Sequence, residues 1–126
     1  MRRPDPAPSI ARRHRVSVDS RAPPPLKGRV FFERRELVEI LRLYGRMVAL
    51  GEWRDYAVDG LSDVAVFSVF RRASETPLYR IEKRPALARR QGQWAVINQS
   101  GHILKRGHEL EQVLKVLSRL HLKAVD

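Results

Sequence analysis

The chain contains an unusually apolar stretch, VAVFSVF, at residues 64–70. Its β-branched and aromatic side chains predict a strand, in which successive side chains point to opposite faces of a sheet. One face would carry Ala65, Phe67 and Val69, and the other would carry Val64, Val66 and Phe70. Both faces of this strand must therefore be covered. Two helices could cover one face each; if both helices share a face, the other face needs a second chain, and the protein would be a homodimer.

Two segments with the period of an α-helix flank the strand region. The first covers residues 34–50, where Glu33 and Glu36 resemble a capping box and Gly51 suits the position after the last turn. The second covers residues 108–122. The apolar positions are Leu37, Ile40, Leu41, Tyr44, Met47 and Val48 in the first segment, and Leu110, Val113, Leu114, Leu117 and Leu120 in the second.

The segments between the helices have the alternating pattern of strands. Turn signals occur at Asp59-Gly60 and Ser100-Gly101, and Pro85 begins a single helical turn. The predicted strands cover 55–60, 64–71, 77–83, 93–98 and 102–105. The sequence thus predicts an α+β fold for residues 29–126, with an N-terminal helix, an antiparallel meander of about five strands and a C-terminal helix.

Residues 1–28 differ from the rest in composition. They hold six of the eight prolines and seven basic side chains, without an apolar period. Such a segment buries too little surface to offset its ordering entropy, so we expect a disordered basic arm rich in Pro and Arg. No apolar region of an export signal and no transmembrane stretch follows, so a cytoplasmic protein without membrane contact is expected. The absence of cysteine excludes disulfides and thiolate metal sites.

The positive charge is concentrated in the middle of the chain. The net charge is +11, and residues 71–106 carry nine basic but only two acidic side chains. Basic side chains at strand ends and in loops commonly contact phosphates, and the arginine fork suits bidentate contacts. The alternative is an arginine-rich surface that only contacts solvent. The predicted polyanion-binding residues are Arg71, Arg72, Arg84, Arg89, Arg90, Lys105 and Arg106, with the first two expected near Arg84 in a hairpin.

A catalytic constellation is not evident. The four histidines lack metal-ligand spacing, and no nucleophile elbow or phosphate-binding loop is present. The nearest pattern for metal-dependent cleavage is Asp59 with Glu82 and Lys83, but adjacent strand residues point to opposite faces. We therefore expect no enzymatic activity, no metal and no cofactor.

Three long segments carry a resemblance to a known family. They are FERRELVEILRLYGRMVALGEWRDYAVDG, AVFSVFRRASETPLYRIEK and LARRQGQWAVINQSGHILKRGHELEQVL. Together they resemble an alphaproteobacterial family that is catalogued only as a domain of unknown function, family 2794 of that series. The resemblance spans residues 30–120 and implies a bacterial, cytosolic protein. It implies no catalytic or binding residues.

These observations favour a small non-enzymatic module that binds nucleic acid or another polyanion through phosphate contacts. The alternative is a protein-interaction or adaptor domain, possibly homodimeric, whose arginines pair with an acidic protein surface.

Overall fold

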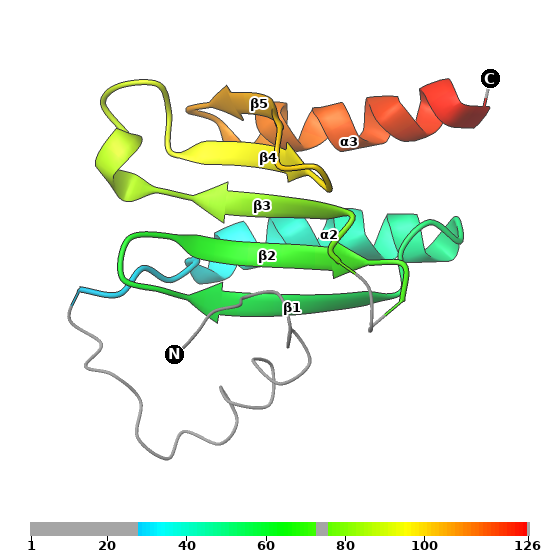
Figure 1. Ribbon diagram of the computed structural model, residues 1–126, viewed down its shortest axis with the longest axis horizontal. Coiled ribbons are helices and arrows are strands. Elements are labelled where there is room, and N and C mark those ends of the chain that lie inside the picture. The colour runs from blue at the N-terminus through cyan, green and yellow to red at the C-terminus, as the bar shows by residue number, and fades with distance from the viewer. Residues whose placement is uncertain (1–27, 73–75, 126) are drawn as a thin grey trace, which may run out of the picture.

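The segments with helical and alternating apolar periods form helices and strands in the predicted order. The structure is a computed structural model that describes residues 28–72 and 76–125 (Figure 1). Its elements confirm the α+β fold. They are α2 (Arg34–Ala49), β1 (Asp55–Gly60), β2 (Ala65–Phe70), β3 (Tyr79–Lys83), the 3-10 helix η1 (Pro85–Leu87), β4 (Trp94–Asn98), β5 (Ile103–Gly107) and α3 (Leu110–Val125).

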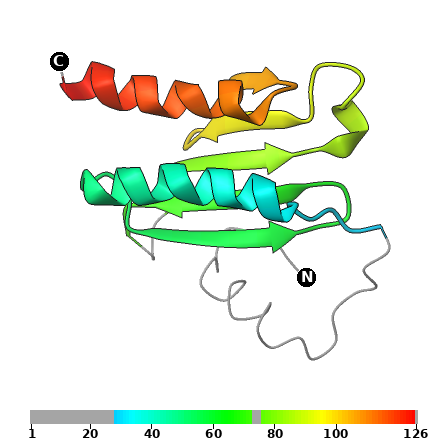
Figure 2. The same ribbon diagram turned by 180° about the vertical axis from the view of Figure 1, so that it is seen from behind.

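The five strands form one antiparallel sheet in the order β1-β2-β3-β4-β5. Each strand pairs with the next strand in the chain, so the sheet is the predicted meander. Both helices lie on the same face of this sheet, side by side, as Figure 2 shows. Of the two arrangements that the sequence allows, the structure adopts the one in which both helices share a face; among residues 28–72 and 76–125, no helix covers the other face.

The core lies between the sheet and the two helices. Alternate strand residues such as Phe67, Val69 and Ile81 point toward the helices and are fully buried. Ile40 of α2 and Leu117 of α3 pack against them. The spacing of the apolar residues predicted the buried face of α3. On α2 it was only partly right, because Leu43, which was not among the predicted positions, is buried, whereas Val48 is exposed.

The two ends of α2 follow from local sequence signals. The Glu33 backbone N–H donates to Oε1 of Glu36 at 2.8 Å, which confirms the capping box. Gly51 ends the helix with φ of 81°, a conformation that glycine adopts without steric cost. Over the described residues, neither α2 nor α3 is long and apolar enough to cross a membrane.

The turn between β1 and β2 differs from the prediction. Asp59 and Gly60 belong to β1, and the turn follows them, closed by a 2.9 Å hydrogen bond from the Leu61 N–H to the Val64 carbonyl. Gly60 is needed for packing instead, because a Cβ there would lie 2.8 Å from the Phe31 ring. Residues 30–32 form no strand, and a hydrogen bond of 2.8 Å from the Val30 N–H to the Leu61 carbonyl joins this segment to the turn.

A nearly buried ion pair joins the sheet to α2. Nζ of Lys83 lies 2.7 Å from Oε1 of Glu36, and the two side chains are only 10% and 13% exposed. Nζ also donates to the Phe31 carbonyl at 3.0 Å and lies 5.9 Å from the centre of the Trp94 ring. Because each charge is largely removed from water, each needs the other.

The substitution Lys83→Met should lower the free energy of unfolding by about 3 kcal/mol, because it leaves the Glu36 carboxylate largely buried without its counter-charge. Urea denaturation of both proteins measures the difference. Arg35→Ala is the matched control: its ion pair with Glu33 has side-chain exposures of 88% and 60%, so its loss should cost less than about 0.5 kcal/mol. Equal losses for the two variants would contradict this role of the buried pair.

Candidate polyanion interface

The loop between β3 and β4 carries Arg89 and Arg90 and has a defined backbone. Pro85 supplies a fixed φ for the first residue of η1. The N–H groups of Arg90 and Gly92 both donate to the Leu87 carbonyl, at 3.0 and 2.9 Å. The Arg84 N–H donates to the Gln93 carbonyl at 2.7 Å and closes the loop at its base. The two arginines therefore project from an ordered turn.

The loop is held against the edge strand β5 by the close approach of two glycines. A Cβ at Gly92 would lie 2.3 Å from the backbone of Gly107, and Gly92 itself has φ of 110°. Nη1 of Arg106 donates to the Gly92 carbonyl at 3.2 Å. These contacts fix the position of the loop relative to β5.

Five of the seven predicted residues gather at one end of the sheet. Lys83 pairs with Trp94, and Trp94 pairs with Gly107, so the end of β3, the start of β4 and the end of β5 coincide at the left of Figure 1. We call this group the basic end; it consists of Arg84, Arg89, Arg90, Lys105 and Arg106.

The other two predicted residues lie at the opposite end of the sheet, so their expected placement near Arg84 was wrong. Val69 pairs with Tyr79, at the start of β3, so Arg71 and Arg72 follow β2 on the side away from Arg84. β3 alone spans about 17 Å at roughly 3.4 Å per residue. The error came from the register: in an antiparallel pair the end of one strand lies beside the start of the next.

The charges of the basic end differ in how far they are neutralised. Nε of Arg84 lies 3.1 Å from Oε1 of Glu82, and Nη1 lies 3.6 Å from Oδ2 of Asp63. By contrast, the exposed side chains of Arg89, Arg90 and Lys105 form no ion pair with any carboxylate of residues 28–72 or 76–125. These three side chains are the ones available to an external anion.

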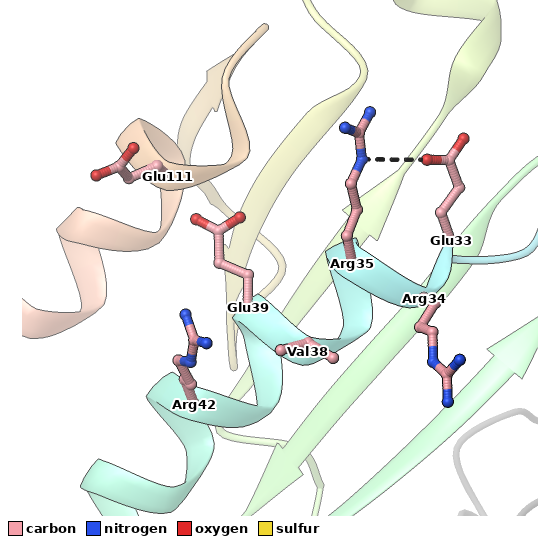
Figure 3. A pocket seen from close by; sticks show the side chains of 7 residues that line it. All are labelled: Glu33, Arg34, Arg35, Val38, Glu39, Arg42 and Glu111. Carbon is pink, nitrogen blue, oxygen red and sulfur yellow. Dashed lines mark ion pairs between the residues drawn. The ribbon is translucent and has the colours of Figure 1, made fainter.

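A second feature, a hollow over α2 and the start of α3, was missed by the sequence analysis. In Figure 3, Glu39 and Arg42 extend from α2 toward Glu111 of α3, while Arg35 turns to Glu33. Acidic and basic side chains alternate here, so the hollow has no net attraction for a polyanion. The repeated arginines of α2 were the sequence signal for this hollow. The similar numbers of acidic and basic residues in that segment made the signal hard to recognise. The lining residues are Glu33, Arg34, Arg35, Val38, Glu39, Arg42 and Glu111.

The carboxylates considered for metal binding are separated. Asp59 of β1 and Glu82 of β3 both pair with Val66, which lies between them in β2. Lys83 points to the other face and contacts α2. Glu82 is instead paired with Arg80 and Arg84. In the part of the chain that the structure describes, no three Asp, Glu or His side chains come together as metal ligands would.

Comparison with protein families gives one match. The family model described as "Protein of unknown function (DUF2794)" matches residues 30–114, which is more than half of the chain. Comparisons with curated proteins and with solved structures gave no match.

The substitution Gly92→Ala should destabilise the fold more than Gly101→Ala. Both positions have positive φ, which costs alanine about 1 kcal/mol. Gly101 has open space around its Cβ position, whereas Gly92 abuts Gly107, so its clash should add about 2 kcal/mol. Urea denaturation measures both values. Similar losses would show that the loop can move away from β5 at little cost.

Proposed function

The chain belongs to the DUF2794 family of proteins of unknown function, and we propose that it binds nucleic acid or another polyanion through the basic end. It would act in the bacterial cytoplasm as a binding module without catalysis of its own. Recognition would be of phosphates and independent of base sequence, because arginine and lysine contacts to phosphate carry no sequence information.

One observation carries this proposal: Arg89, Arg90 and Lys105 are exposed and unpaired among the described residues, while neighbouring cations are paired. Arg84 and Lys83 each have a carboxylate partner, so those charges stabilise the fold. A cation left without a partner on an ordered loop favours an external anion, because its charge is not already satisfied within the protein.

Phosphate neutralisation and counterion release would provide the affinity. If Arg89, Arg90 and Lys105 each neutralise one phosphate, the plot of log K against log salt concentration should have a slope of about −2.7 on duplex DNA. Arg71 lies at the far end of the sheet, 3.7 Å from Oε1 of Glu52, and is not part of this surface.

The double variant Arg89→Ala, Arg90→Ala should make this slope less steep by about 1.8, because two phosphate contacts are lost. Fluorescence anisotropy with duplex DNA, duplex RNA and single-stranded RNA at three salt concentrations measures the change. The matched control is Arg71→Ala, Arg72→Ala, which removes the same charge from the opposite end of the sheet. The proposal fails if the wild-type chain does not bind at low salt, or if both double variants change the slope equally.

A protein-interaction domain is the second candidate function. The observation that favours it is the same set of exposed cations, Arg89, Arg90 and Lys105, which form no ion pair among the described residues and would suit an acidic protein surface as well as phosphates. Size-exclusion chromatography with light scattering distinguishes the candidates: a stable dimer whose mass is independent of salt would favour the interaction domain, since phosphate contacts weaken with salt.

A further inference from the structure

A groove runs between α2 and α3 on the surface of the helix layer that these two helices form. Both helices start at the same end of the domain and run in the same direction (Figures 1 and 2). The groove has a volume of about 260 Å³, and the buried side chains of Leu43 and Leu114 form its floor. Its walls carry charges of both signs, from Glu39, Arg42 and Arg46 of α2 and from Glu111 and Lys115 of α3.

These charges are separated by sign along the helices. Glu39 and Glu111 lie near the starts of α2 and α3, where both also line the hollow (Figure 3). Arg46 and Lys115 follow them by one to two helical turns and line the groove but not the hollow. Because the helices run in the same direction, both change from acidic to basic toward the same end of the helix layer.

The charges of the groove are not neutralised within the part of the chain that the structure describes. The ion pairs among residues 28–72 and 76–125 involve none of the five charged side chains. Four of the five are exposed, and Glu39 is half-buried. A polyanion would meet the two carboxylates as well as the cations. The groove therefore favours a protein surface that presents both signs in the complementary order.

We propose that a second copy of this chain docks on the helix layer, with a twofold axis that passes through the groove. A half-turn about this axis reverses the direction of the helices, so the acidic starts of one protomer lie over the basic ends of its partner. Glu39 and Glu111 of each protomer then face Arg46 and Lys115 of the other. The same surface thus supplies both halves of the interface. The dimer does not depend on polyanion binding, because the basic end is formed by the sheet and the loop 84–93.

The dimensions of the helix layer predict a weak dimer. Each helix has 16 residues. Two helices of this length offer a surface about 24 Å long and about 20 Å wide. Two such surfaces bury roughly 1,000 Å² in total, which is near the lower limit for a specific interface. Most of the contacting side chains are charged, so we expect the dimer to weaken as the salt concentration rises.

Sedimentation velocity of the full-length chain, without nucleic acid and over a series of protein concentrations, measures the dissociation constant of the dimer at low and high salt. Glu39→Lys, Glu111→Lys makes the groove basic, and Arg46→Glu, Lys115→Glu makes it mainly acidic. Each double variant alone should raise the dissociation constant by at least about tenfold at low salt, because four ion pairs are replaced by like charges.

An equimolar mixture of the two double variants should dimerise again, because a basic groove then faces an acidic one; this rescue requires that both variants are folded. The matched control Arg71→Glu, Arg72→Glu makes the same change in charge as the second variant, but at the end of β2, and should leave the dissociation constant unchanged. The proposal is overturned if the wild-type chain remains a monomer at low salt, if the mixture remains monomeric, or if the control dissociates as the groove variants do. A dimer that the groove variants leave intact would also overturn it and would assign the contact to another face.

Discussion

Strand β2 is buried along its whole length, and the rest of the domain is organised around that burial. Phe67 and Val69 pack against both helices on one face, where α2 and α3 also contact each other. Val66 and Phe70, on the other face, then need a different cover. Because a sheet exposes alternate side chains on two surfaces, a strand that is apolar throughout requires three layers.

The basic residues of this protein serve two different purposes. Lys83 and Arg84 are adjacent, yet Lys83 holds α2 to the sheet through Glu36 while Arg84 pairs with carboxylates on the opposite face. Arg89 and Arg90 are held away from such partners by the η1 turn and the close contact of Gly92 with Gly107. A high count of arginines is thus a poor guide to binding, since a cation that is already paired within the fold attracts an external anion less.

The sequence by itself determined the local elements. The hydrophobic period predicted both helices, the order of the strands and the buried side of α3, and the capping box placed the start of α2. These signals are local, because they depend on the spacing of nearby residues. Only the tertiary structure decided that both helices share one face, that Asp59 and Gly60 remain in β1, and that Arg71 and Arg72 lie far from Arg84. Each of those outcomes depends on strand register and on contacts between residues distant in the chain, such as Gly60 with Phe31, which the spacing of neighbouring residues does not encode.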